Sequence, residues 1–386
     1  MTRKEFLRLS SILGLTLPFP SLLFSQGERR EPPGSVLIIG AGAAGLSAGY
    51  LLAQQNIDFQ IVEASDGYGG RIKQDTTFTD FPLSLGGEWL HVAESELSAI
   101  VNDAGVNLTP VTRGYDAQDR IATYRNRKLT YDTMGTEYRD RKFIGITWLG
   151  FFETYILPAV ASRIAYNAPI TAIDCAGHGV TATTQSGRSF RADRVIVTVP
   201  LKILQEGLIS FKPELPSRKQ KAIRDANIWG GIKVFLEFTE KFYPVFLEFA
   251  DSETSTGQRT YYDAAYGQAS SANILGLFAV GQQAEPYQNL RGDAQRDYIL
   301  NELDAIFNHA ASRTYVKHRV QNWNEEPYAR AAYLADVAAS ATSRRMAESV
   351  DDKLYFAGDA YTQENDWSAV HNAARSARAA VHEILS

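Results

Sequence analysis

The chain has 386 residues, of which 45% are hydrophobic, so it is long enough to bury a large core in two or more domains. Its 39 lysines and arginines against 44 aspartates and glutamates give a net charge of −5 without any block of like charge, which argues against nucleic acid as a main partner. The single cysteine, Cys175, excludes an internal disulfide and a cysteine-based metal site. Because the six histidines form no His-x-x-x-His pair, we predict no bound metal.

Residues 1–26 have the features of an export signal rather than of the folded protein. Residues 1–8 are basic, residues 9–24 are apolar and residues 25–27 are small and polar, which is the order of a secretory signal. The apolar run is too short to cross a bilayer comfortably. Residues 2–8 (TRKEFLR) resemble a twin-arginine signal in which lysine replaces the second arginine. We therefore expect export, to the periplasm, with retention as an uncleaved anchor as the alternative.

A glycine-rich turn between two apolar segments organises the first part of the remaining chain. Residues 36–39 (VLII) have a strand pattern, and residues 40–45 (GAGAAG) follow as G-x-G-x-x-G before a helix-forming run. The first glycine permits the tight turn, the second lets backbone approach a pyrophosphate, and the third lets helix pack on strand. A second strand, 59–62, ends on Glu63, whose carboxylate can accept both hydroxyl protons of a ribose. The order predicts a dinucleotide-binding unit, with a buried structural turn as the alternative.

Two further glycine-rich turns follow this unit. In the first, residues 67–71 (GYGGR), paired glycines and Arg71 suit a loop that passes close to phosphates and neutralises them. Flavin-binding domains need such a second glycine pair, whereas nicotinamide-binding domains usually do not. The second turn, residues 85–91, reads LGGEWLH and combines glycines with an aromatic side chain.

In these three turns the sequence resembles the flavin-containing amine oxidases, the family of monoamine oxidases, polyamine oxidases and lysine-specific histone demethylases. The resemblance continues to the end of the chain in the family's order. The matching segments are residues 40–45, 63–71, 86–91, 192–201, 233–236 and 354–359.

The resemblance implies an α/β fold with a discontinuous Rossmann-type FAD-binding domain and a mixed α+β substrate domain. The expected FAD-binding segments are 35–94, 160–228 and 325–386, and the expected substrate-domain segments are 95–159 and 229–324. Residues 91–162 have a charged, helical pattern. Residues 163–200 predict strands, and residues 231–315 predict strands followed by a helix over 291–307.

The resemblance also implies which residues bind FAD. Ile170 falls where a strand of the family contacts the adenine, although an ordinary core position is equally expected there. Asp359 follows the strand 354–357, where the family has an acid bonded to the ribityl chain. Residues 368–385 predict a helix whose N-terminus would stabilise negative charge on the reduced ring. The predicted FAD-binding residues are Gly40, Gly42, Ala43, Ala44, Gly45, Glu63, Ala64, Gly70, Arg71, Gly86, Gly87, Glu88, Trp89, Ile170, Trp323, Gly358, Asp359, Ser368, Ala369 and Val370.

Residues 322–333 resemble the family segment that crosses the flavin ring. Monoamine oxidases carry there a cysteine that bonds to the flavin; the matching residue in this chain is Ala332, so the resemblance implies non-covalent FAD. Tyr333 then forms one wall of an aromatic pair around the substrate amine. The second wall falls at Val370, so the aromatic cage is incomplete and a monoamine specificity is not expected.

Lys233 lies in residues 231–238, whose β-branched and aromatic content predicts a strand. With period two, Lys233, Phe235 and Glu237 share one face, and from spacing alone that face is expected to be solvated. The resemblance implies instead that Lys233 reaches flavin N5 through a water molecule. Lys233 and Tyr333 are therefore the predicted catalytic residues.

The reaction implied by the resemblance is oxidation of an amine at its C–N bond. Hydride passes from the α-carbon to flavin N5, the imine hydrolyses, and the electrons pass to O2, giving H2O2, or to another acceptor. Three alternatives remain: an L-amino-acid oxidase using Arg113 or Arg330 for the substrate carboxylate, a desaturase or protoporphyrinogen-type oxidase of an apolar substrate, and a flavin-binding protein without turnover. The expected partners are a small amine and an electron acceptor, with no nucleic acid and no stable membrane span once the signal is removed.

Overall fold

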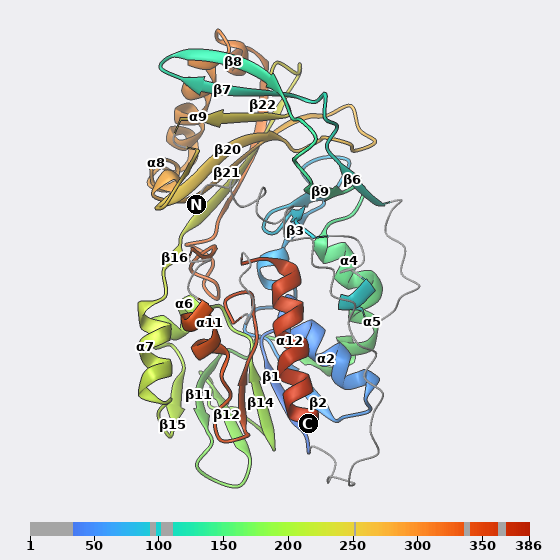
Figure 1. The fold of residues 1–386 in the computed structure, drawn as a ribbon, viewed down its shortest axis with the longest axis vertical. Coiled ribbons are helices and arrows are strands. Elements are labelled where there is room, and N and C mark those ends of the chain that lie inside the picture. Colours follow the sequence, from blue (N-terminus) through green and yellow to red (C-terminus); the bar gives the residue numbers. More distant parts are fainter. Residues whose placement is uncertain (1–33, 93–97, 102–110, 251, 336–339, 362–367) are drawn as a thin grey trace.

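The computed structural model describes residues 34–92, 98–101, 111–250, 252–335, 340–361 and 368–386. Two regions lie end to end along the long axis of the molecule, a parallel sheet with helices below and a larger, mainly antiparallel sheet above (Figure 1). The predicted export signal, residues 1–26, lies outside the described residues. Within the described ranges no helix combines the length and the apolar character that a bilayer span requires.

A five-stranded parallel sheet forms the centre of the first region. Its strands, in spatial order, are β10 (Ile164–Ala165), β2 (Phe59–Val62), β1 (Val36–Ile39), β14 (Arg194–Val197) and β24 (Leu354–Phe356). All four residues of β1 are buried because both faces of the sheet are covered. The strand–turn–helix–strand order predicted around Glu63 is present as β1, α2 (Ala43–Gln54) and β2.

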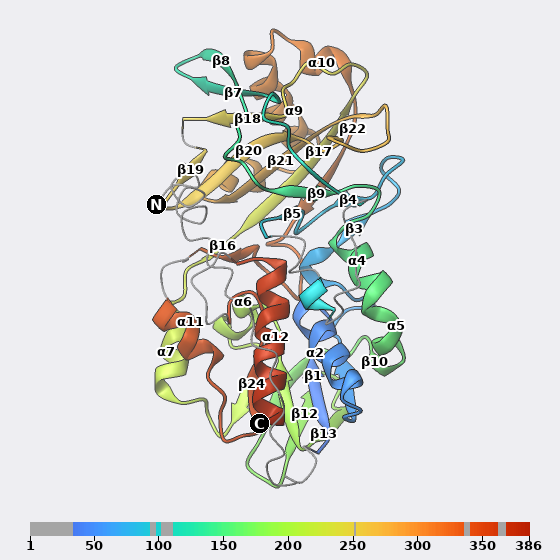
Figure 2. The same ribbon diagram turned by 45° about the vertical axis from the view of Figure 1, so that its right-hand side comes forward.

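The two faces of β1 pack against different layers. Val36 and Ile38 belong to a core shared with α2, with α12 (Val370–Leu385) and with α4 (Trp148–Tyr155) and α5 (Leu157–Val160). Figure 2 shows α12 beside α2 on the same side of the sheet. Leu37 and Ile39 face a second core that contains a four-stranded sheet. That sheet has the order β13 (Ser189–Ala192), β12 (Val180–Thr184), β11 (Ile170–Asp174), β15 (Ser210–Lys212).

The antiparallel region is built on one eight-stranded sheet. Its order is β22 (Tyr315–Asn322), β17 (Gly231–Phe238), β21 (Asn273–Gly281), β20 (Gly257–Asp263), β18 (Phe246–Phe249), β7 (Arg120–Arg125) and β8 (Lys128–Thr133), with β19 (Glu253–Thr254) paired to β20. The helix predicted over 291–307 is present as α9 (Gly292–Ile306) and packs in one core with alternate residues of β17.

The central strand β17 is buried on both of its faces. Ile232, Val234 and Leu236 face the core that contains α9, whereas Phe235 packs with Phe78 and other residues of the segment 78–85. The expectation from spacing alone, that Lys233 lies on a solvated face, is therefore wrong: its side chain is 4% exposed. The segment that covers this face consists of bends and the two-residue strand β4 (Leu83–Ser84), which is too short to give a periodic pattern in the sequence.

Residues 112–143 form strands rather than the helices that their charge pattern suggested. Strands β7 and β8 pair as a hairpin in which Asn126 and Arg127 have φ values of 52° and 59°. Two consecutive positive-φ residues are typical of a two-residue hairpin loop. The helical interpretation is wrong here because the exposed polar residues belong to an edge hairpin, where they protect the sheet edge.

Short elements connect the two regions and complete the fold. The small pairings are β3 (Gln74–Asp75) with β4 (Leu83–Ser84), β16 (Ile228–Trp229) with β23 (Tyr333–Leu334), and β5 (Trp89–Leu90) and β6 (Thr112–Gly114) on either side of β9 (Arg141–Phe143). The remaining helices are η1 (Gly70–Ile72), η3 (Ala161–Arg163), α6 (Leu201–Gln205), α7 (Ser217–Asp225), η4 (Gln282–Ala284), α8 (Glu285–Gln288), α10 (Ala310–Thr314) and α11 (Ser340–Ala347).

Candidate active site

A cavity of about 1180 Å³ has walls from both regions. This volume exceeds the roughly 300–1,000 Å³ of most small-molecule pockets, so it leaves room for a dinucleotide together with a substrate. Every predicted FAD-binding residue except Gly45 lines it, and so do Lys233 and Tyr333. The structure thus brings the predicted site residues together, from segments that span the chain.

The end of the cavity near β1 has the backbone that a pyrophosphate requires. Gly40 has φ of 110°, and a Cβ atom on Gly45 would lie 1.9 Å from the carbonyl oxygen of Gly40, so only glycine lets α2 pack this closely. Gly45 therefore shapes the cavity wall through helix packing and does not line the cavity itself. Helix α2 begins beside the cavity, and its N-cap residue, Gly42, makes no side-chain cap, which leaves N–H groups of the first turn for an anion. These features fit FAD.

Glu63 sits at the end of β2, buried against the first glycine turn. Its Oε2 accepts a hydrogen bond from the Ala41 backbone N–H (2.7 Å), and its Oε1 accepts from the N–H and hydroxyl of Ser65 (2.9 and 2.8 Å). A carboxylate has about four lone-pair sites, so both oxygens keep capacity for ribose hydroxyls. These local hydrogen bonds fix the orientation of the carboxylate at the cavity wall.

We expect Glu63→Gln to weaken FAD binding by about 1.5–3 kcal/mol, because it replaces a charge-assisted acceptor with a neutral amide. Titration of flavin-free protein with FAD measures this directly. Asp58→Asn is a matched control, since Asp58 precedes the same strand but is 75% exposed and pairs with Arg163. Equal FAD affinity in Glu63→Gln and wild type would show that Glu63 is not the ribose ligand.

Arg71 links three separate segments of the chain at the cavity wall. Its guanidinium forms an ion pair with Asp359 through both nitrogens, one of them at 3.0 Å, and donates to the Ala332 carbonyl oxygen at 2.6 Å. The Ser368 hydroxyl also donates to Asp359. From the sequence, Arg71 and Asp359 were expected to contact separate parts of the cofactor. In the structure their charges pair with each other. No sequence signal points to this pair, because 288 positions separate its members.

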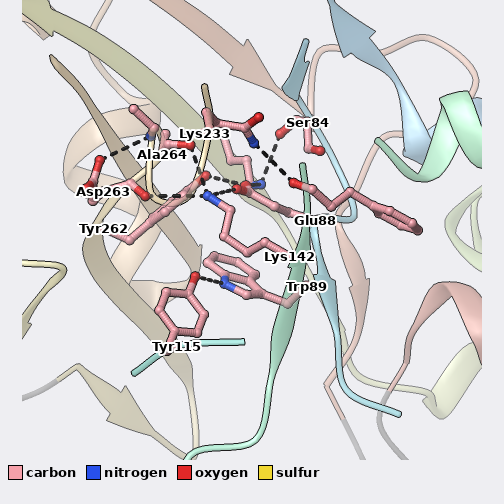
Figure 3. A network of polar contacts seen from close by, with 12 residues as sticks. Ser84, Glu88, Trp89, Tyr115, Lys142, Lys233, Tyr262, Asp263 and Ala264 are labelled. Atoms are coloured by element: carbon pink, nitrogen blue, oxygen red, sulfur yellow. Dashed lines mark hydrogen bonds and ion pairs between the residues drawn. The ribbon is translucent and has the colours of Figure 1, made fainter. Parts of the chain in front are cut away.

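A buried charge cluster lies where β17 meets the cavity (Figure 3). Lys233 Nζ lies 2.7 Å from Oε2 of Glu88 and donates to the Ser84 carbonyl oxygen at 3.1 Å. A second lysine, Lys142 of β9, lies 3.0 Å from the other carboxylate oxygen, Oε1. Tyr262 of β20 donates its hydroxyl to Oε2 at 2.5 Å. We call these four residues, Lys233, Glu88, Lys142 and Tyr262, the lysine cluster.

Electrostatics within the lysine cluster favour an ionised Glu88. Burial by itself would raise the pKa of Glu88, but the charges of Lys233 and Lys142 and the hydrogen bonds from Lys233 and Tyr262 outweigh it and lower the pKa to about 2. Burial lowers the pKa of Lys233, and the charge of Lys142 lowers it further, against the opposing effect of Glu88. Sequence reasoning placed Glu88 with the cofactor and missed Lys142 and Tyr262, which no motif marks.

Aromatic side chains cover another part of the cavity wall. Tyr333 of β23 packs against Trp229 with ring centroids 6.2 Å apart, and its hydroxyl lies 3.5 Å from Oε1 of Gln258. Trp89 and Phe278 pack edge to face at 5.9 Å and also line the cavity. The predicted wall at Tyr333 is thus joined by Trp89, which the sequence assigned to FAD binding, and by Phe278, which the sequence did not single out.

Of the two arginines considered for a substrate carboxylate, only Arg330 lines the cavity, and both are paired with acids. Arg113 is not among the described residues that line the cavity, and it pairs with Asp116 at 3.3 Å. Arg330 reaches the cavity, but its guanidinium is 43% exposed and pairs with Glu206 at 2.6 Å.

Comparison with known proteins agrees with the geometry. A model of the family "Flavin containing amine oxidoreductase" matches residues 43–144 and 156–385. Polyamine oxidase 4 of Oryza sativa subsp. japonica is 24% identical over 94% of this chain and 91% of its own length. Lysine-specific histone demethylase 1B of Mus musculus is also 24% identical, over 84% of this chain and 50% of its own length.

Solved structures give the same fold. Putrescine oxidase with bound putrescine superposes with a TM-score of 0.74 at 17% identity, over 91% of this chain and 99% of that one. The predicted α/β architecture, a Rossmann-type domain joined to a mixed substrate domain, is confirmed by this likeness.

Proposed function

The chain belongs to the family of flavin-containing amine oxidoreductases and is an FAD-dependent enzyme, and from this premise we propose that it oxidises the C–N bond of an amine and passes the electrons to O2. One observation carries the proposal. Buried Lys233 lines the same cavity as the glycine turns that fit a pyrophosphate and the aromatic wall at Tyr333. One cavity thus combines a site for a dinucleotide, an aromatic wall for a small substrate and the buried amino group of Lys233. This combination suits oxidation of a small substrate.

FAD, when bound, supplies the two-electron acceptor that takes a hydride from the carbon next to nitrogen. The chain supplies the surroundings. Glu63 would hold the ribose, and the N-terminus of α2 would hold the pyrophosphate. Tyr333, Trp89 and Phe278 exclude water from the chamber, and burial there favours the neutral form of a substrate amine. Lys233 presents a donor at the cavity wall that can hold the water which hydrolyses the imine to a carbonyl compound and an amine.

The experiment is an anaerobic panel of putrescine, longer polyamines, monoamines, L-amino acids and apolar alkenes or porphyrin precursors. We expect the flavin to be bleached only by amines that carry no carboxylate. Air should then restore its colour with formation of peroxide. Bleaching by L-amino acids alone, or by apolar compounds alone, would assign one of the rival reactions. Bleaching by none of the panel would leave the amine oxidase proposal without support.

The flavin itself gives a second check on the same preparation. Ala332 offers no thiol at the position where some relatives of this fold bond their cofactor, so we propose non-covalent FAD. Acid precipitation is expected to release the yellow flavin into the supernatant, and flavin retained in the pellet would contradict this.

We also propose that the protein is exported through a twin-arginine route, on the support of the residue pattern in 1–26. Replacing Arg3 and Lys4 by glutamine is expected to keep the protein in the cytoplasm, folded and loaded with flavin. Cell fractionation locates the wild type and the variant, and N-terminal sequencing shows whether residues 1–26 have been removed. Full-length wild-type chain found in the cytoplasm would rule the proposal out.

A further inference from the structure

The lysine cluster places two lysines on one carboxylate, and their surroundings differ. Lys142 is 2% exposed and is not among the described residues that line the cavity. Its Nζ lies 3.0 Å from Glu88 Oε1, 3.0 Å from the Ala264 carbonyl oxygen and 3.4 Å from the Asp263 carbonyl oxygen. An ammonium has three N–H donors, so these acceptors account for all of them.

Lys233 is placed differently, because it lines the cavity. Its contacts with the described residues are Glu88 Oε2 at 2.7 Å and the Ser84 carbonyl oxygen at 3.1 Å. Two contacts leave one of three ammonium donors for whatever occupies the cavity. Figure 3 shows both lysine side chains converging on Glu88 from different strands.

The charges of the cluster do not balance when both lysines are protonated. Two ammonium groups and one carboxylate leave a net charge of +1 among side chains that are almost fully buried. Uncompensated charge in such a site is costly, so one proton is held more weakly than the other. Hydrogen bonds to a charged form favour it, and Lys142 has more of them, so the weakly held proton is that of Lys233.

In the part of the chain that the structure describes, no acid other than Glu88 contacts Lys233 Nζ. Tyr262 donates its hydroxyl to Glu88, and the rings of Trp89, Tyr262 and Phe235 lie 5.2, 5.6 and 5.8 Å from Lys233 Nζ. These rings favour the charged form only modestly. Of the nearby acids, Asp263 turns its carboxylate to Lys241 at 2.6 Å, and Asp140 pairs with His91 at 3.0 Å.

We propose that Lys142 is a positioning residue that neutralises Glu88 and thereby lets Lys233 exchange a proton with the cavity. The inference rests on the proposed function, because the exchange matters only if Lys233 faces a substrate amine. A neutral Lys233 accepts the proton that an alkylammonium substrate loses on becoming a neutral amine, and the balance is one proton moved from substrate nitrogen to Lys233 nitrogen. Without Lys142, Glu88 pairs with Lys233 alone and holds it as an ammonium.

The titration of each lysine tests this without any substrate. Holoenzyme labelled with [ε-13C]lysine gives one 13C–1H signal per lysine, and Lys233→Arg and Lys142→Arg identify the two signals by their loss. In the wild type, the Lys233 signal is expected to titrate at least about one pH unit below the value of roughly 10.4 that an unperturbed lysine has. A Lys233 midpoint at or above that value, or no titration of Lys233 while the protein stays folded, would overturn the proposal.

Two variants shift the Lys233 titration in opposite directions if the proposal holds. Lys142→Met is expected to raise its midpoint by at least about one pH unit, a tenfold change in the acid dissociation constant. The pH profile of anaerobic flavin reduction should move the same way, whereas Lys142→Arg should leave both near the wild-type values. Glu88→Gln is expected to lower the midpoint.

An unchanged Lys233 midpoint in Lys142→Met would overturn the proposal, and if that variant does not fold, the Lys233 midpoint of the wild type decides. The two proposals fail separately. If the Lys233 midpoint shifts in Lys142→Met but the protein oxidises no amine, the proposed function is rejected and the role of Lys142 stands. If the protein oxidises amines but the midpoint does not shift, the role of Lys142 is rejected and the proposed function stands.

Discussion

Glu88→Gln is expected to lower the free energy of unfolding by about 3–5 kcal/mol, because it leaves Lys142 and Lys233 buried without their anion. Urea denaturation of both proteins at neutral pH measures the difference. Glu206→Gln is the matched control: its carboxylate pairs with Arg330 at a partly exposed site, where a pair contributes about 0–1 kcal/mol. Equal stability of Glu88→Gln and wild type would show that the cluster does not carry the charges assigned to it.

The same interaction predicts an acid dependence. The pKa of Glu88 falls from 4.5 to about 2 on folding, so the unfolded state binds the proton more tightly than the folded state. The stabilisation from ionised Glu88 is therefore complete above about pH 4.5 and is lost as the pH falls toward 2. The stability difference between wild type and Glu88→Gln should shrink over this interval, and a constant difference would contradict the assignment.

Lys233→Met is expected to slow flavin reduction, reoxidation or both by at least tenfold, about 1.4 kcal/mol of barrier, while FAD stays bound. In contrast to Glu88→Gln, this variant should fold normally, because Lys142 still pairs with Glu88 and methionine adds no buried charge that would need a partner. Stopped-flow absorbance measures the two half-reactions separately.

The matched control for Lys233→Met is Lys317→Met. Lys317 lies on the neighbouring strand β22, is 48% exposed and pairs with Glu237 of β17. The control variant therefore removes a nearby lysine without changing a residue that lines the cavity. Wild-type rates in both half-reactions of Lys233→Met would mean that Lys233 does not act on the reaction, and the oxidase account would lose its strongest catalytic residue.

The sequence predicted the elements whose signals are local. The glycine turn at residues 40–45, the acid at Glu63 and the strands between 170 and 197 follow from short-range periodicity and turn chemistry, and the structure has them. The strand around Lys233 and the helix α9 were found in the same way. Each depends on residues within one or two turns of the chain, so one segment suffices to identify it.

Features that depend on tertiary packing were not predictable. The burial of Lys233 follows from the segment 78–85, which covers β17. The pairing of Lys142 with Glu88 depends on the pairing of β9 with β5. The hairpin of β7 and β8 was mistaken for helix because its exposed edge carries the polar residues that a surface helix also carries. Charge pairs between distant segments leave no trace in a single sequence.

The central claim, oxidation of an amine at its α-carbon, is tested most directly by one stopped-flow comparison. The holoenzyme is mixed without oxygen with the amine that bleaches it best and with the same amine deuterated at the α-carbon. The account predicts that the flavin absorbance falls in both cases and more slowly with deuterium, because the α-C–H bond breaks in that step. Bleaching that is insensitive to α-deuterium, or no bleaching by any amine, would contradict it.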